Sequence, residues 1–89
     1  MPARNVVDVL RSQLAAQRQA LNADYYALAA RNPGAMRGVV WNSAQPEASP
    51  LLNTLSGSRA VLGISRLQSQ RGAILLTLQQ LRELDPSAR

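Results

Sequence analysis

A seven-residue apolar repeat runs through two segments of this chain and constrains its fold more than any other feature. The positions that keep this spacing are Val7, Leu14, Leu21 and Leu28 in the first segment and Leu67, Ile74 and Leu81 in the second. A heptad repeat places its apolar side chains on one side of an α-helix, where they pack against another helix. The repeat therefore predicts helix-on-helix packing, and it is information about partners rather than about chemistry.

Size and composition narrow the kinds of protein that this chain can be. Its 89 residues form one domain at most, and so small a domain gains little stability from its own core. The absence of cysteine and histidine excludes disulfides, thiolate zinc sites and catalysis built on those side chains. The five carboxylates are scattered without a pairing spacing, and no glycine-rich phosphate loop follows a strand. We therefore expect no enzyme, no catalytic residue, no cofactor and no metal.

Charge and hydropathy limit the partners and the location. The net charge is +5, and all ten basic residues are arginine. Such charge fits nucleic acid, an acidic protein surface or anionic lipid, but charged residues make up only 17% of the chain, which is low for a dedicated nucleic-acid binder. The start is too polar for a signal peptide, and no apolar run approaches the length that spans a bilayer. We therefore expect a cytoplasmic protein with no membrane contact.

The first helix is marked at both ends. Asn5 is a good N-cap residue, and Asp8 favours the positive end of the helix. The residues that follow are rich in Ala, Leu, Gln and Arg, which are good helix formers, until a proline and a glycine at 33–34 end the pattern. These signals predict a helix over about 5–31.

The second helix has a clear start signal and a weaker interior. A serine followed by a proline, at 49–50, is typical of an N-cap and a first helical position. The pattern predicts a helix over about 50–84 and a short tail at 85–89. Glycines weaken this helix, and its most probable break is at 56–58. The alternative for Gly63 is that it allows close approach of a neighbouring helix.

Residues 32–49 link the two helices. A structureless loop of this length is unusual in a compact domain. The segment forms either a short third helix that reaches Val40 or an extended stretch over 38–41 that crosses the bundle. We therefore predict a single all-α domain over 1–89: an antiparallel two-helix hairpin, with or without a short third helix in the linker, that forms a helical bundle by dimerisation.

Aromatic residues in and near the linker are candidate partner contacts. Trp41 is the only tryptophan and Arg37 is close by; Trp, Tyr and Arg dominate binding hot spots. The alternative, which we favour, is that Trp41 and the two preceding valines fold back over the end of the hairpin, because small domains rarely expose such a patch. Tyr25 falls at the edge of the apolar stripe and is expected to pack, whereas Tyr26 points elsewhere and is the better partner contact.

The second segment carries more apolar residues than one neighbouring helix covers. Beside its main stripe it has a second row, formed by Leu51, Leu55, Leu62 and Leu76. One antiparallel neighbour covers only one face of a helix. The second row therefore predicts self-association into a four-helix bundle or binding of a protein client.

Arginines repeat beside the apolar stripe. Arg4, Arg11 and Arg18 are spaced by seven, and Arg59 and Arg66 repeat this spacing in the second segment. Such a basic stripe fits contacts with nucleic-acid phosphates. The alternative is that these positions keep the helices soluble and pair with neighbouring charges. The absence of lysine and the scarcity of aromatic residues favour this alternative.

Polar residues interrupt the predicted helix seam at Gln17, Asp24 and Arg71. Such residues lower stability but fix register and oligomeric state. An Asp24–Arg71 pair is expected only across subunits or with a large stagger, because a simple hairpin places Arg71 nearer the start of the first helix. The alternative is that each residue lies at the edge of the stripe, with the stem of Arg71 covering leucines.

Together these patterns favour a small non-enzymatic protein-interaction module that binds another protein through its helix faces. A regulatory antagonist, an adaptor or a secretion-type chaperone fits this description. The partner is a second copy of the chain, a protein client, or both. The alternative function is a nucleic-acid-binding helical dimer that uses the arginine stripe, and fold alone does not decide between the two.

Overall fold

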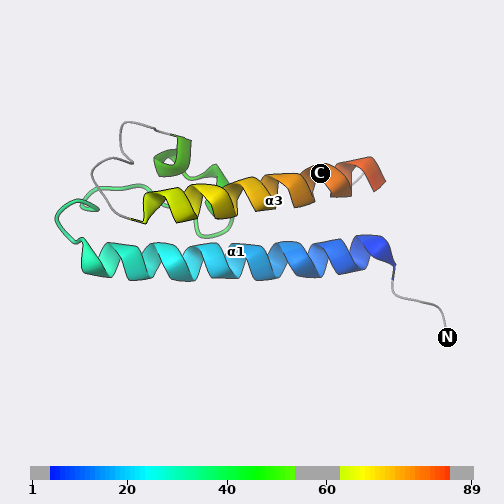
Figure 1. Cartoon of the computed structure of the whole chain (residues 1–89), viewed down its shortest axis with the longest axis horizontal. Helices are drawn as coiled ribbons and strands as arrows, with labels where there is room; N and C mark the ends of the chain where they lie inside the picture. Colours follow the sequence, from blue (N-terminus) through cyan, green and yellow to red (C-terminus); the bar gives the residue numbers. More distant parts are fainter. Residues whose placement is uncertain (1–4, 54–62, 85–89) are drawn as a thin grey trace.

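The chain folds into an antiparallel helical hairpin (Figure 1). The structure, a computed structural model, describes residues 5–53 and 63–84. Two long helices, α1 (Val6–Arg31) and α3 (Ile64–Leu84), run in opposite directions and pack against each other. The predicted all-α hairpin is therefore confirmed.

The linker contains helical turns rather than a third α-helix. Over residues 32–53 the helical pieces are two short 3-10 helices, η1 (Pro46–Ala48) and η2 (Pro50–Asn53). Residues 33–38 form turns, so of the two alternatives for the linker, the short helix that reaches Val40 does not form. No helix of the described chain is long and apolar enough to cross a membrane.

The ends of α1 lie where the sequence predicts them. Asn5 caps the first turn, because its Oδ1 accepts a hydrogen bond of 2.7 Å from the backbone N–H of Val7. At the other end, the backbone N–H and the side-chain amide of Asn32 both donate to the carbonyl oxygen of Leu28, at 3.0 Å each. The proline that follows has no N–H to continue the ladder.

The second helix begins later than predicted. The sequence places its start near residue 50, whereas the chain there forms η2 and α3 begins at Ile64. Gly63 precedes Ile64 with φ +102°, a left-handed conformation that favours glycine and interrupts a helix. A Cβ on Gly63 would lie 3.1 Å from Leu28 Cδ1, so this glycine also allows the close approach that the sequence offered as an alternative. The predicted break at 56–58 lies outside the described residues.

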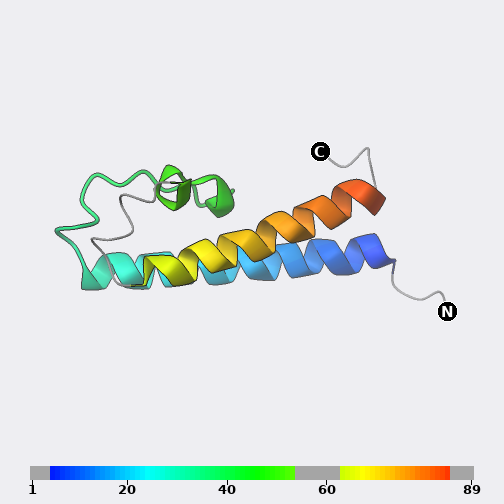
Figure 2. The same cartoon turned by 45° about the horizontal axis from the view of Figure 1, so that its top comes forward.

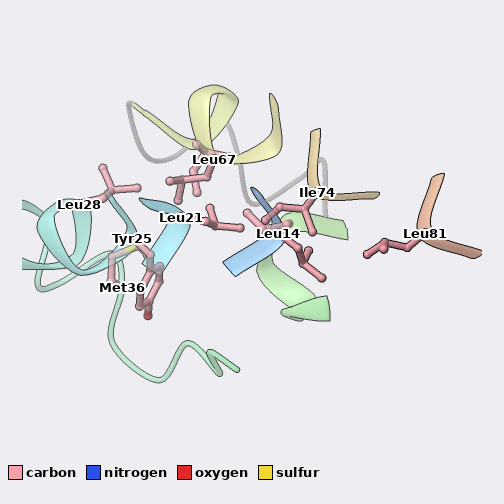
Figure 3. Packing of buried hydrophobic residues seen from close by; sticks show 10 residues of the cluster. Leu14, Leu21, Tyr25, Leu28, Met36, Leu67, Ile74 and Leu81 are labelled. Atoms are coloured by element: carbon pink, nitrogen blue, oxygen red, sulfur yellow. The ribbon is translucent and has the colours of Figure 1, made fainter. Parts of the chain in front are cut away.

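The heptad positions form the core between the helices (Figure 3). The buried apolar residues of the two helices are Leu14, Leu21, Tyr25 and Leu28 from α1 and Ile64, Leu67, Ile74 and Leu81 from α3. Leu67 lies beside Leu21, and Ile74 lies beside Leu14 (Figure 3). Each leucine or isoleucine that is fully buried contributes about 1.5–3 kcal/mol by removing apolar surface from water. The repeat therefore identified the packed faces correctly.

Hydrogen bonds between side chains fix the register beside this core. Gln13 Nε2 donates to Thr77 Oγ1 at 3.0 Å, and Thr77 Oγ1 donates to Gln17 Oε1 at 2.9 Å. Nearer the loop, Gln70 Nε2 donates to Asp24 Oδ2 at 2.8 Å. These pairs give Gln17 and Asp24 hydrogen-bond partners, whereas Gln70 Oε1 is buried without a partner among the described residues. They oppose a slip of one helix along the other.

The prediction that a simple hairpin places Arg71 nearer the start of the first helix was wrong. Because α3 starts later than expected, a simple hairpin brings Asp24 beside Gln70, without a large stagger or a second subunit. Arg71 turns to the other side of α3, where its Nε donates to the backbone carbonyl of Glu47 at 2.9 Å. Arg66 approaches Asp24 instead, with Nε 3.4 Å from Oδ2.

The linker covers only one half of the hairpin (Figures 1 and 2). η1 packs on both long helices and η2 packs on α3. The covered half contains residues 18–31 of α1 and 64–74 of α3, together with the linker. The open half contains residues 6–17 and 75–84, where Figure 2 shows α1 and α3 alone.

Candidate functional site

An aromatic stack fixes the first part of the linker on α1. The rings of Trp41 and Tyr25 lie parallel, with centroids 3.8 Å apart and planes 2° apart. Trp41 Nε1 donates to Asn22 Oδ1 at 2.8 Å, and Asn22 Nδ2 donates to the carbonyl oxygen of Ser43 at 2.9 Å. The Tyr26 hydroxyl shares a hydrogen bond with Ser43 Oγ. Trp41 therefore packs back on the hairpin, as the favoured alternative predicts.

Burial changes the chemistry of the stacked tyrosine. Tyr25 is only 5% exposed. Burial raises the pKa of its hydroxyl above the ordinary value of about 10, and the neighbouring Tyr26 adds to this shift. Tyr25 is therefore neutral at physiological pH and acts as a packing group.

Glu47 is the central contact between the linker and the helices. Its side chain is 6% exposed, and Arg18 binds both carboxylate oxygens, with Nε 3.1 Å from Oε1 and Nη2 2.5 Å from Oε2. Arg71 Nε donates to its backbone carbonyl, so both long helices hold the same linker residue. A two-point arginine–carboxylate pair fixes geometry as well as charge. We call Glu47, Arg18 and Arg71 the carboxylate seat.

The linker also fixes its own backbone beside the carboxylate seat. Asn42 Oδ1 accepts hydrogen bonds from the backbone N–H groups of Ala44 and Gln45, at 3.1 and 3.0 Å. The backbone N–H of Asn42 donates at 2.9 Å to Oγ of Ser49, which is fully buried. These local bonds satisfy backbone groups that no long helix pairs, and they hold Glu47 in position.

A groove continues from the carboxylate seat into the open half. Its volume is about 500 Å³. The residues that line it are Arg11, Leu14, Arg18, Gln45, Glu47, Leu78, Leu81 and Arg82. The leucines come from the seam between the helices, and arginines from both helices flank them. The groove lining therefore combines apolar and basic side chains.

Large apolar side chains are exposed in the same half of the molecule. The exposed ones on the helices of the open half are Val6, Val9, Leu75, Leu76 and Leu84. In the covered half, the described chain exposes only Tyr26 and Val40 among large apolar residues. None of the five exposed residues of the open half is among the residues that line the groove.

The predicted aromatic and basic partner contacts near the linker lie in the covered half. Tyr26 is half-exposed and is hydrogen-bonded through its hydroxyl, and Arg37 is exposed in the turns that follow α1. Trp41 is partly buried by its stack on Tyr25. The structure brings Tyr26 and Trp41 together around Tyr25, but neither lines the groove.

The second leucine row does not form a single helix face, so that prediction was wrong. Leu51 belongs to η2 and packs against the core, whereas Leu76 is exposed on α3 in the open half. The late start of α3 separates them, and the linker folds back over the helices. Leu55 and Leu62 lie outside the described residues.

The arginines do not form one stripe in the described part of the chain. Arg11 and Arg18 line the groove, and Arg18 is bound in the carboxylate seat. Arg66 lines a separate, smaller hollow, next to an aspartate of α1. Arg4 and Arg59 lie outside the described residues.

Sequence reasoning missed Glu47 and the groove, although two signals pointed to them. Glu47 is the only acidic residue between Asp24 and Glu83 in a basic chain. An Arg-x-x-Leu pattern occurs twice on α1, at Arg11–Leu14 and Arg18–Leu21. Residues seven apart lie on nearly the same side of a helix, so the two patterns form consecutive sections of one groove wall.

Over residues 5–53 and 63–84, no three His, Cys, Asp or Glu side chains gather where they could hold a metal ion. Comparisons with protein-family models, curated proteins and solved structures found no match to this chain.

Proposed function

We infer that this chain is a small non-enzymatic protein-interaction module that binds another protein through the open half of its hairpin. The observation that carries this proposal is the uneven covering of the two helices. The linker packs on one half, while the other half leaves apolar side chains and a leucine-lined groove exposed. Exposed apolar surface of this kind is typical of a protein-binding site.

The energetics support a polypeptide partner. Burying apolar surface contributes about 25 cal/mol per Å², so covering even part of an exposed leucine such as Leu76 is favourable. The linker supports the same conclusion, because it is a polypeptide segment that already packs on the other half of the groove between the helices. A regulatory antagonist, an adaptor and a secretion-type chaperone would each act by covering a partner in this way.

A second copy of the chain is one partner that fits. Two hairpins that join through their open halves would form a helical bundle, and the contact would be the same patch on both copies. A protein client would use the same surface. Both partners predict that the open half, and not the covered half, is the contact region.

Nucleic-acid binding receives less support from the side-chain contacts. Arg18 is bound to Glu47, and Arg66 lies near Asp24, so acidic groups of the chain already neutralise part of the proposed stripe. An arginine that is held by a carboxylate gains less from a phosphate.

The test compares association of the full chain with that of two variants. We expect the native chain to form dimers at micromolar concentration in light scattering, or to bind an apolar dye as a monomer. The double variant Leu76→Gln/Leu84→Gln should lose this behaviour. Val40→Gln, which changes an exposed apolar residue of the linker in the same way, should keep it.

Two results would overturn the proposal. One is a strictly monomeric native chain that binds no apolar dye. The other is retention of RNA or DNA at low salt that survives Leu76→Gln/Leu84→Gln and is lost in Arg11→Gln/Arg82→Gln, because that pattern identifies phosphate as the ligand.

A further inference from the structure

We propose that the groove of the open half binds an acidic, apolar segment of a partner protein, in the way that η1 and η2 occupy the covered half. This proposal rests on the protein-interaction function and specifies the chemistry of the partner. It needs no change in the hairpin, because the groove is already formed.

The chain's own linker shows which chemistry this surface accepts. Glu47 places a carboxylate on Arg18, and its backbone carbonyl accepts a hydrogen bond from Arg71. Five residues further on, Leu52 is buried in the core between the linker and the helices. An acidic residue followed by an apolar residue thus fits the covered half, with one contact electrostatic and the other apolar.

The same elements recur one heptad along α1. Arg18 and Leu21 belong to the covered half, and Arg11 and Leu14 repeat their spacing at the groove. Seven residues of α-helix span about 10.5 Å, so the second position lies about that far along the same side. Arg82, from α3, lines the groove together with Arg11 and adds a basic side chain from the other helix.

The charge of the groove favours a carboxylate ligand. Among the described residues, three arginines and one glutamate line it, and Arg18 binds that glutamate. The leucines among the lining residues would contact the apolar part of the same ligand. An arginine binds a carboxylate in a fixed fork geometry, and nearby leucines supply the apolar contact that a free inorganic anion would not use.

The size and position of the groove favour a short segment rather than a whole helix. A volume of about 500 Å³ holds a few side chains. Because Gln45 and Glu47 of the linker are among the residues that line the groove, a bound segment would lie against the linker. An extended or 3-10 segment of a partner, with an acidic residue near an apolar one, fits this space.

A synthetic peptide taken from the chain itself provides the probe. The peptide has the sequence Gln45–Asn53, with blocked ends, and is added to the isotope-labelled full chain while NMR spectra are recorded. We expect the methyl resonances of Leu14, Leu78 and Leu81 to shift. A peptide with Glu47→Gln should bind about threefold more weakly or worse, and salt raised from about 0.05 M to about 0.5 M should weaken the native peptide in the same direction.

Matched variants of the full chain locate the contact. Arg11→Gln/Arg82→Gln should raise the Kd for the native peptide about fivefold to tenfold. Arg37→Gln removes the same kind of charge outside the groove and should leave the Kd unchanged. Dispersed NMR spectra of each variant show that it is folded, so that a loss of binding reports on the groove.

Several outcomes would overturn this inference while the interaction function stands. Equal binding of the native and the Glu47→Gln peptide would show that the groove does not select acid. Shifts confined to Trp41 and its neighbours would show that the peptide replaces the linker. The methyl resonances of Leu14, Leu78 and Leu81 could instead shift when unlabelled full chain is added to the labelled chain, while the peptide does not bind. That result would show that a second copy fills the groove. A monomer that binds neither peptide nor apolar dye would remove both proposals.

Discussion

The covered and open halves of this hairpin are built from the same two helices, but the linker packs on the groove between them in only one half. In the covered half the groove between the helices is filled by the linker, which is held by the Trp41–Tyr25 stack and by the Arg18–Glu47 ion pair. In the open half the groove is lined by leucines and arginines, and other apolar side chains of both helices are exposed. The heptad core is continuous through both halves, so core packing does not explain the difference.

This difference shows what a linker can do for a pair of helices. Two helices leave grooves along both sides of their seam, and a third element is needed to cover them. Here the linker reaches only part of one groove, because it must also return to the start of α3. In the part that it does not reach, the groove between the helices stays open.

The largest expected effect tests whether the two halves differ in stability. Leu21 is fully buried in the covered half, so Leu21→Ala should lower the free energy of unfolding by about 3 kcal/mol, through lost burial and a cavity. Leu76 is exposed in the open half, and Leu76→Ala should change it by less than about 0.5 kcal/mol. Urea unfolding followed by circular dichroism measures both values. Similar losses in the two variants would contradict the comparison.

The next effect tests whether the carboxylate seat is what holds the linker. Glu47→Gln leaves Arg18 partly buried without its counter-charge and should destabilise the chain by about 2 kcal/mol. Because Trp41 is the only tryptophan, its fluorescence should shift to longer wavelength as the linker loosens, while the helical signal is retained. Glu83→Gln, at an exposed position of the open half, is the matched control. An equal loss of stability and an equal fluorescence shift in this variant would show that the carboxylate seat does not hold the linker.

Two glycine substitutions test the backbone conformation at the start of α3 and in its middle. Gly63→Ala should destabilise the chain by about 1–2 kcal/mol, since φ is +102° and the new Cβ would lie 3.1 Å from Leu28 Cδ1. Gly72→Ala meets no atom within 4 Å in the middle of α3 and should stabilise it by about 0.5–1 kcal/mol. Thermal unfolding of the two variants measures whether each change raises or lowers stability. A higher stability of Gly63→Ala would be inconsistent with the left-handed conformation of this residue.

The smallest expected effect is a pH dependence that belongs to the covered half. The pKa of Tyr25 is raised in the folded chain, so its contribution to stability is full below the unfolded pKa of about 10 and is lost as pH rises through the higher folded value. The loss should be below about 1 kcal/mol between about pH 9 and about pH 11. Tyr25→Phe keeps the ring stack and should show a weaker pH dependence in urea unfolding. An unchanged pH dependence in this variant would exclude Tyr25 as its source.

Part of the fold could be predicted from the sequence, because the residues that determine it act on neighbouring backbone groups. The cap at Asn5 and the chain stop after Arg31 act through neighbouring backbone groups, and the structure places the ends of α1 there. The start of the second helix was not readable in this way. Ser49 and Pro50 do begin a helical turn, but it is a short 3-10 helix, and the left-handed Gly63 sets the start of α3.

The candidate site was readable only in fragments. The sequence identified Trp41 as a packing residue and Leu76 as surplus apolar surface, and both lie where those interpretations place them. It gave no role to Glu47, because the partner of that carboxylate is 29 residues away on another element. It also grouped Arg18 with Arg66, which the structure places in different hollows.

The sequence by itself determined two helices, the faces on which they pack and the ends of the first one. Periodicity and capping decide these features, because they depend on residues within a turn or two of each other. Only the tertiary structure decided the register of α3, the path of the linker and therefore which half of the groove stays open. Those features depend on contacts such as Arg18–Glu47 and Trp41–Tyr25, which form between distant residues once the hairpin has brought the helices together.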